Sequence, residues 1–442
     1  MSIDRTDKWR AGQSVLLRDA TVPTCMLDDE TAPNNQDYCR LDILLRGGLI
    51  ERIAAEINLQ EGDDLCVVDM DGGMVWPTLV DMHTHLDKGH IWPRKPNPDG
   101  TFDGALTAVG EDRGENWTAE DVRARMDFSL RCAFAHGTGA IRTHLDSIPP
   151  QDSISWPVFE EMRQAWAGRI ELQAAALFGI DMLQRDETFL KQIVERIAET
   201  GGVLGAVTYM IPELDQNLDE IFQAAIDTGL DLDFHVDETA DPSARSLHHI
   251  AQAALRNGFE GKLVCGHCCS LARQEEEETN ATLDLVAKAG IGIVSLPLCN
   301  MYLQDRVSGR TPRWRGVTLL HEMKQRGIEV AVASDNTRDP FYAYGDLDLV
   351  EVFREATRII HLDHPIGNWP ASIASTPGRM MSIPGRGWIK EGNPADLILF
   401  GARTWAELLS RPQSDRKVVR AGEQIDQTLP DYRELDYLMG AV

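Results

Sequence analysis

The segment Val80-Asp81-Met82-His83-Thr84-His85-Leu86-Asp87 carries two histidines one residue apart, and it follows an apolar run from Met74 to Val80. The apolar run predicts a short buried strand, and alternate side chains of a strand point to the same side. His83 and His85 therefore present two imidazole rings to one point, as a metal site requires. Because a bare His-x-His pair also occurs by chance, the other ligands have to come from elsewhere in the chain.

Strand-like runs alternate with helix-like runs between about Met74 and Ser375. Eight such strands are predicted, with ends at Val80, Thr143, Leu177, Val207, Phe234, Val264, Val294 and Ala333. Each but the last is followed by a helical pattern, of which the run from Ala119 to Ala135 is an example. The alternation predicts an α/β fold of the (β/α)8 TIM-barrel type. A doubly wound open sheet is the alternative, but no Gly-x-Gly-x-x-Gly follows a first strand.

The two ends of the chain have a different pattern from the barrel. Short strand-like pieces such as Ser14–Leu17 and Leu41–Leu45 occur before it, and residues 387–400 predict a turn and a strand after it. We therefore expect a small β domain formed by the N- and C-terminal segments. The predicted boundaries are residues 1–72 and 378–442 for this domain, the latter including an acidic tail, and 73–377 for the barrel.

Composition narrows the classes of partner. The 442 residues are 43% hydrophobic, enough for a sizeable core, and carry a formal net charge of −27. This charge argues against nucleic acid and anionic membranes and favours small neutral or cationic ligands. No hydrophobic signal core and no apolar stretch of roughly 20 residues is present, so we expect a cytoplasmic protein with reduced cysteines. A homo-oligomer is compatible with the sequence.

Polar residues gather where the predicted barrel strands end, and barrel enzymes carry their chemistry at these ends. They are His83 and His85 at the first strand, His144 at the second, His235 and Glu238 at the fifth, His267 at the sixth and Asp335 at the eighth. This pattern predicts one metal ion bound by His83, His85, His235 and Asp335. Imidazole and carboxylate ligands suit Zn²⁺ or Fe²⁺ and do not choose between them.

Two further residues have predicted roles beside such a metal, which would lower the pKa of a bound water to about 7. Glu238 lies three residues past a ligand and could move protons between water and substrate. His267 could hydrogen-bond the hydroxide or a developing oxyanion. A salt bridge on the barrel rim is the alternative for Glu238, and a structural role is the simpler interpretation of His144.

This set of strand ends resembles the amidohydrolase superfamily, whose pattern is His-x-His, His-x-x-Glu, His and Asp at strands one, five, six and eight. A closer resemblance is to its cytosine-deaminase-like branch. The segments that carry it span nearly the whole chain and are His83–Asp87, Arg142–Asp146, His235–Glu238, Pro297–Gln304, Arg313–Gly316 and Ser334–Phe341.

The resemblance implies hydrolytic deamination of an amino-substituted nitrogen heterocycle. It implies catalytic roles for Glu238, which protonates a ring nitrogen, for His267, which orients the water, and for Asp335, which takes a proton from that water. Binuclear relatives use a carboxylated lysine at strand four, and the stretch Gly205–Met210 has no lysine. One divalent ion, zinc or iron(II), is therefore expected.

The match departs from cytosine deaminases where the ring is recognised. Their glutamine after strand three falls on or near Gly179, beside Phe178, and their second aspartate is Asn336. Phe341 matches an aromatic position near the substrate, with core packing as its alternative. These four residues are the candidate substrate contacts. The long segment from Lys88 to Trp117 is interpreted as a loop that forms a lid or a wall of the site.

Three functions stay open. The first is release of ammonia from cytosine or a related ring such as 5-methylcytosine, isocytosine, creatinine, isoguanine or an aminotriazine. The second is hydrolysis of another C–N bond, in an N-alkylaminotriazinone or a cyclic amide. The third, a non-enzymatic binding protein, is disfavoured by the intact set of metal-ligand residues.

Overall fold

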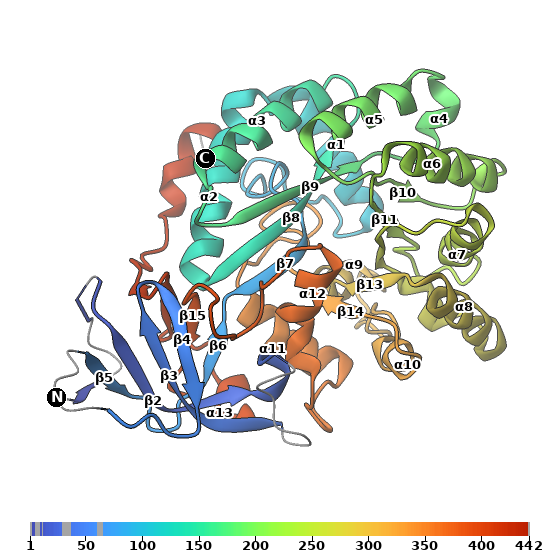
Figure 1. Ribbon diagram of the computed structural model, residues 1–442. Helices are drawn as coiled ribbons and strands as arrows, with labels where there is room; N and C mark the ends of the chain where they lie inside the picture. Colours follow the sequence, from blue (N-terminus) through green and yellow to red (C-terminus); the bar gives the residue numbers. More distant parts are fainter. Residues whose placement is uncertain (1, 5–8, 11, 29–36, 60–64, 441–442) are drawn as a thin grey trace. The chain divides into compact units, whose positions relative to one another are not determined.

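The computed structural model describes residues 2–4, 9–10, 12–28, 37–59 and 65–440, and these form two compact units (Figure 1). The first unit comprises residues 1–80, 131–140 and 348–429, and the second comprises 81–130, 141–347 and 430–442. Among the described residues, no helix has the length and apolar character needed to cross a membrane.

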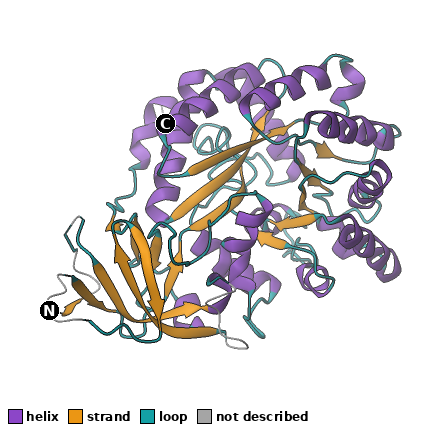
Figure 2. Cartoon of the chain, viewed as in Figure 1, coloured by secondary structure: helices purple, strands orange, loops and turns teal. Residues whose placement is uncertain are grey.

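The first unit contains two sheets, drawn as orange arrows in Figure 2. One has the strand order β1-β5-β2-β3-β4, and the other has the order β17-β16-β15-β6. Their bounds are β1 Ser2–Asp4, β2 Val15–Pro23, β3 Tyr38–Arg46, β4 Leu49–Ala54, β5 Cys66–Asp69, β6 Val75–Pro77, β15 Leu397–Leu399, β16 Lys417–Arg420 and β17 Glu423–Gln424. The helical segments are η1 Thr24–Met26, α11 Leu349–Ile360, η3 Trp369–Ile373, α12 Ser375–Met380 and α13 Trp405–Ser410.

Both ends of the chain build this unit, which confirms the predicted small β domain. The amide of Ile50 donates to the carbonyl of Asn393 at 2.9 Å. One apolar core contains buried residues from both ends, among them Leu17 and Ile43 from the N-terminal strands and Leu397 and Val419 from the C-terminal ones.

The second unit contains the predicted barrel. Its strands are β7 Leu79–Thr84, β8 Thr138–Asp146, β9 Glu171–Leu177, β10 Val207–Thr208, β11 Leu232–Val236, β12 Leu263–His267, β13 Gly292–Ser295 and β14 Val330–Val332. They form the ladders β7-β8-β9 and β10-β11-β12-β13-β14. Parallel bridges from Gly179 to Val207 and from Thr84 to Asp335 join the two ladders and close the ring.

Helices α3 and α5 to α8 lie on the outside of these strands (Figure 1). The remaining helical bounds are α1 Phe102–Asn116, α2 Ala119–His136, α3 Asp152–Ala165, α4 Met182–Arg185, α5 Phe189–Thr200, α6 Leu214–Thr228, α7 Ser246–Asn257, η2 Cys269–Arg273, α8 Glu276–Ala289, α9 Pro297–Leu303, α10 Leu320–Gln325 and η4 Tyr432–Leu438. Helix α6 is typical: Leu218, Ile221, Phe222 and Ala225 are buried at helical spacing, and Gly229 ends it with a φ of 70°.

Two sequence interpretations were wrong in detail. The apolar run Met74–Val80 is not one strand, because Val75–Pro77 pairs with β15 and the first barrel strand begins at Leu79. The segment Lys88–Trp117 is not simply a loop, since its second half is helix α1. The hydroxyl oxygen of Thr101 caps that helix by accepting a hydrogen bond from the amide of Gly104 at 3.0 Å.

The acidic tail, which the sequence did not place, belongs to the second unit. Within η4, the ring of Tyr432 stacks on Phe128 with centroids 5.6 Å apart, and its hydroxyl donates to Asp346 at 3.0 Å. The guanidinium carbon of Arg338 lies 4.0 Å from the centroid of the same ring. The tail therefore packs on helix α2 and on the loop that follows β14.

Candidate active site

Three imidazoles and one carboxylate converge at the C-terminal ends of β7, β11 and β14. Nε2 of His83 lies 3.1 Å from Nε2 of His235, which lies 3.3 Å from Nε2 of His85. Oδ1 of Asp335 lies 3.2 Å from Nε2 of His85 and 3.7 Å from Nε2 of His83. The four predicted ligands therefore meet at one point.

These atoms have the spacing and chemistry of a metal site. Four ligands at 2.0–2.1 Å from a tetrahedral centre lie about 3.3–3.4 Å from one another, and the separations here are of that size. Burial lowers the pKa of His83, His85 and His235 well below the ordinary value, so the rings are neutral and can ligate. Both carboxylate oxygens of Asp335 are buried without a hydrogen-bond partner among the described residues. The residues present fit one divalent ion.

Local backbone features place these groups. A Cβ atom on Gly266 of β12 would lie 2.9 Å from Cε1 of His83, so a glycine leaves room for that ring. Asp335 and His267 have φ angles of 63° and 69°, a left-handed conformation that non-glycine residues rarely adopt. Such strained residues concentrate at functional sites.

His144 lies beside the four convergent groups, with its ring centroid 4.0 Å from that of His83, but it faces a different carboxylate. Its Nε2 lies 3.9 Å from the carboxylate of Asp233, which already accepts a hydrogen bond from Arg142 at 2.8 Å. The charge of Arg142 beside this carboxylate disfavours a second cation there.

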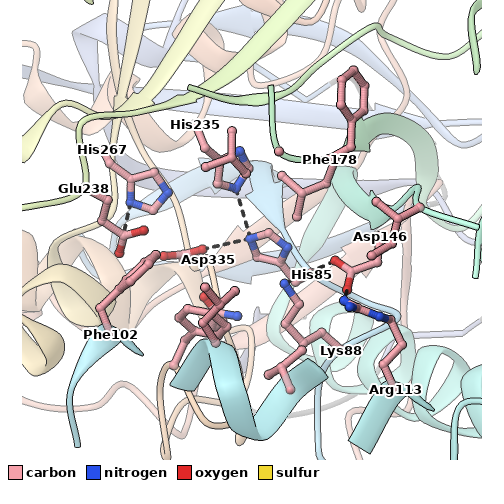
Figure 3. A pocket seen from close by; sticks show the side chains of 18 of the residues that line it. His85, Lys88, Phe102, Arg113, Asp146, Phe178, His235, Glu238, His267 and Asp335 are labelled. Carbon is pink, nitrogen blue, oxygen red and sulfur yellow. Dashed lines mark hydrogen bonds and ion pairs between the residues drawn. The ribbon is translucent and has the colours of Figure 1, made fainter. Parts of the chain in front are cut away.

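The two candidate proton-handling residues lie next to each other. Oε1 of Glu238 is 3.4 Å from Nδ1 of His267 (Figure 3). Nδ2 of Asn300 is 3.0 Å from both atoms. Burial and the neighbouring charge of Asp335 raise the pKa of Glu238 well above its ordinary value. Burial raises the pKa of Asp335 to about 7. These carboxyl groups can hold a proton near neutral pH, as acid–base catalysis requires.

A cavity of about 330 Å³ opens onto these groups (Figure 3). Its polar end is formed by His85, His235, Glu238, His267 and Asp335, and its walls include the apolar side chains of Phe102, Leu106, Val109, Ile148, Leu177 and Val207. The four predicted substrate contacts, Phe178, Gly179, Asn336 and Phe341, all line it. Helix α1 supplies part of the wall, which is one of the two roles considered for the segment after the first strand.

Other side chains occupy the space at Gly179, the position expected for the glutamine of cytosine deaminases. A Cβ atom on Gly179 would lie 2.8 Å from both the hydroxyl of Tyr209 and the carboxylate of Asp181. Tyr209 lines the cavity and donates its hydroxyl to Asp181. A side chain at residue 179 would displace this pair. Tyr209 therefore occupies the space that a glutamine side chain at residue 179 would need.

The sequence analysis did not identify three charged residues on the cavity wall, Lys88, Arg113 and Asp146. Nζ of Lys88 lies 3.4 Å from Asp146, and Arg113 donates to the same carboxylate at 2.6 Å (Figure 3). Asp146 ends the second barrel strand, a signal that could have identified it. Arg113 lies on α1, whose helical character was not recognised.

The chain is similar to known proteins over nearly its whole length. A model described as "Amidohydrolase family" matches residues 186–429. The chain is 57% identical over 426 residues to a pterin deaminase of Rhizobium rhizogenes, covering 96% of this chain and 97% of the relative. It is 24% identical over 382 residues to an N-isopropylammelide isopropyl amidohydrolase of Pseudomonas sp., covering 83% and 89%.

The fold also recurs among solved structures. The 5-methylcytosine deaminase from Klebsiella pneumoniae, liganded with 5-fluorocytosine, matches with a TM-score of 0.80 at 23% identity over 95% of this chain and 98% of that one. The resemblance inferred from the strand ends is thereby confirmed: the chain belongs to the amidohydrolase family.

Proposed function

We propose that this protein is a metal-dependent hydrolytic deaminase of a pterin, the bicyclic 2-amino-4-oxopteridine. The observation that carries the proposal is the 57% identity to a pterin deaminase across 96% of this chain. A cavity of about 330 Å³ supports it, since pockets for small organic ligands begin at ~300 Å³. The aromatic side chains of Phe102, Phe178 and Phe341 suit a flat ring.

The metal would be held by His83, His85, His235 and Asp335. When bound, a divalent ion would supply a water molecule with a pKa of about 7. We propose a single ion, because the segment around β10, Gly205–Met210, carries no lysine that could bridge a second. Zn²⁺ and Fe²⁺ both suit the three nitrogens and one oxygen.

The side chains then divide the proton transfers. The water oxygen forms a bond to the amino-bearing ring carbon, and the C–N bond breaks to release ammonia and leave an oxo group. Asp335 takes one proton from the water and passes it to the departing amine. Glu238 gives its proton to the neighbouring ring nitrogen and regains one from the second hydrogen of the attacking water as the oxo group forms. His267 donates a hydrogen bond to the attacking oxygen.

Pterin is not among the rings inferred from the sequence, but it is related to one of them. A pterin contains the 2-amino-4-oxopyrimidine edge of isocytosine, fused to a pyrazine ring. Of the monocyclic rings predicted, isocytosine therefore presents the same hydrogen-bonding edge to the site. The apolar walls would contact the second ring and favour the bicyclic compound through buried apolar surface.

Steady-state kinetics on a panel of rings tests the proposal. The panel contains pterin, isocytosine, 5-methylcytosine, cytosine, creatinine, isoguanine and N-isopropylammelide, with ammonia or isopropylamine release as the readout. We expect the highest kcat/KM on pterin and a lower value on isocytosine. A higher kcat/KM on N-isopropylammelide would favour the alternative C–N hydrolase, and no amine release from any ring would refute the deaminase proposal.

A further inference from the structure

Asn300 occupies a central position behind the two proton-handling residues. It lies on the short helix α9, which begins at Pro297 after β13, and it is fully buried. Nδ2 of its amide is 3.0 Å from Oε1 of Glu238 and 3.0 Å from Nδ1 of His267. One side chain therefore contacts both residues.

The chemistry of an amide nitrogen restricts its two partners. An NH2 group has two hydrogens to donate and does not accept, so each partner must offer a lone pair. The Nδ1 atom of His267 therefore carries no hydrogen, because two donors 3.0 Å apart would repel each other. The neutral ring then carries its hydrogen on Nε2.

The reverse orientation of the Asn300 amide, with Nδ2 and Oδ1 exchanged, is disfavoured by the surroundings of Oδ1. Oδ1 of Asn300 is buried without a partner among the described residues. Reversal would leave two N–H donors unpaired there instead of one carbonyl, and orphaned buried N–H groups are the rarer defect. Reversal would also require hydrogens on both Nδ1 of His267 and Oε1 of Glu238. The two orientations thus predict opposite tautomers of His267.

The Nε2 atom of His267 is free to act on the reaction. It has no hydrogen-bond partner among the described residues, although it is buried. His267 offers a ring nitrogen within 4.8 Å of nitrogens of His83 and His235. An N–H group at this position can donate to an oxygen held by those residues.

The residue that follows helix α9 also contacts the backbone of Glu238. Nε2 of Gln304, four residues after Asn300, donates to the carbonyl of Glu238 at 3.1 Å. With Oε1 held by Asn300, the second carboxyl oxygen is the one available to the cavity, which Glu238 lines.

We propose that Asn300 is a positioning residue for the deamination proposed above: it holds His267 as the Nε2–H tautomer and orients Glu238 through two donated hydrogen bonds. The inference rests on the proposed function for its catalytic meaning, whereas the tautomer is a property of the protein alone.

Nitrogen-15 NMR of histidine-labelled protein tests the tautomer directly. The His267 signals are assigned as those lost in His267→Gln, and we expect the Nε2–H form in the wild type. In Asn300→Asp the carboxylate only accepts, so the Nδ1–H form should replace it. An Nδ1–H tautomer in the wild type would overturn the proposal without any variant having to fold.

Kinetics separates positioning from simple support of the fold. We expect Asn300→Ala and Asn300→Asp to lose at least about 10²-fold in kcat on the preferred ring with little change in KM, the lower range for acid–base catalysis. Metal content and Tm are measured alongside. The control Met301→Ala, at a half-exposed neighbour on the same helix, should retain wild-type kinetics.

The outcomes distinguish the two proposals. A loss of kcat in Asn300→Asp with the His267 tautomer unchanged would overturn the positioning role. A wild-type protein with the expected tautomer but no activity on any ring would refute the proposed function and leave the hydrogen-bond assignment supported.

Discussion

Replacing Glu238 with glutamine separates proton transfer from binding. The structure indicates that Glu238→Gln is well tolerated, because a glutamine oxygen can still accept the hydrogen bond from Asn300 at 3.0 Å. Burial raises the pKa of Glu238 in the folded protein, so the unfolded chain releases this proton more readily. As pH rises above about 4.5, ionisation of Glu238 therefore stabilises the unfolded state. The glutamine variant should be as stable as the wild type at pH 7, or more stable.

Its activity should nevertheless fall sharply. Loss of a positioned acid–base group costs about 10²–10⁴-fold in kcat, equal to about 3–5 kcal/mol of activation free energy. KM should change little, since shape and the Asn300 contact are kept. The assay is ammonia release with pterin, together with metal content and urea unfolding. Glu260→Gln, at an exposed glutamate, is the matched control. Turnover of Glu238→Gln within about tenfold of the wild type would remove Glu238 from the mechanism.

Three further predictions follow from single side chains. His85→Ala should reduce bound zinc or iron below about half an equivalent per chain in elemental analysis; full occupancy would exclude His85 as a ligand. Burial lowers the pKa of His90 to about 3, so the unfolded state takes up the extra proton below pH 6.5 and stability falls as pH falls. His90 should thus cost ~2 kcal/mol of unfolding free energy between pH 8 and pH 5, and His90→Asn should remove that part of the pH dependence in urea unfolding. Tyr432→Ala should destabilise the protein by about 1–2 kcal/mol in the same assay, through loss of the Phe128 and Arg338 contacts; an unchanged value would show that the tail contributes nothing.

The barrel could be predicted because its pattern is local and repeated. Runs such as Leu263–His267 are buried throughout, as expected for strands covered on both faces, and helical runs separate them. The break near Thr78 could not be predicted in this way. Apolar residues lie on both sides of it. Only the pairing of Val75–Pro77 with the distant β15 separates β6 from the first barrel strand. Helix α1 escaped notice because its glycines and scattered polar residues give no apolar stripe.

Only those residues of the candidate site that lie at the ends of barrel strands could be predicted. His83, His85, His235 and Asp335 come together because parallel strands end on one face of a barrel. Tyr209, Arg113 and Asn300 reach the site through the conformations of the segments after β10, β7 and β13, which a single sequence does not specify. In the sequence, Asn300 was only one residue of the segment Pro297–Gln304 that carries the family resemblance. Its contacts with Glu238 and His267 became evident only from the three-dimensional structure.

Asn336 illustrates how the structure sharpens a sequence inference about the ring. An asparagine can donate or accept, so its sequence position alone left the complementary ring edge open. Here Nδ2 donates to Asp339 at 2.7 Å, and the thiol of Cys299 lies 3.5 Å from Oδ1. The amide is thereby oriented, and its oxygen retains capacity to accept a hydrogen bond from a ring N–H in the cavity.

Asn336 thus offers the acceptor that an aspartate would offer, without its charge. This difference matters because burial already raises the pKa of Asp335 to about 7 and that of Asp339 to about 6. A further carboxylate between them would raise both values and leave Asp335 more often protonated, in which state it could not serve as a metal ligand or take a proton from water. The neutral amide therefore preserves the ionised form of Asp335 and leaves an acceptor that an N–H of the proposed ring could use. On this argument Asn336→Asp should weaken metal binding at neutral pH before it changes the preferred ring, and metal titration of that variant at pH 6 and pH 8 would reveal the order.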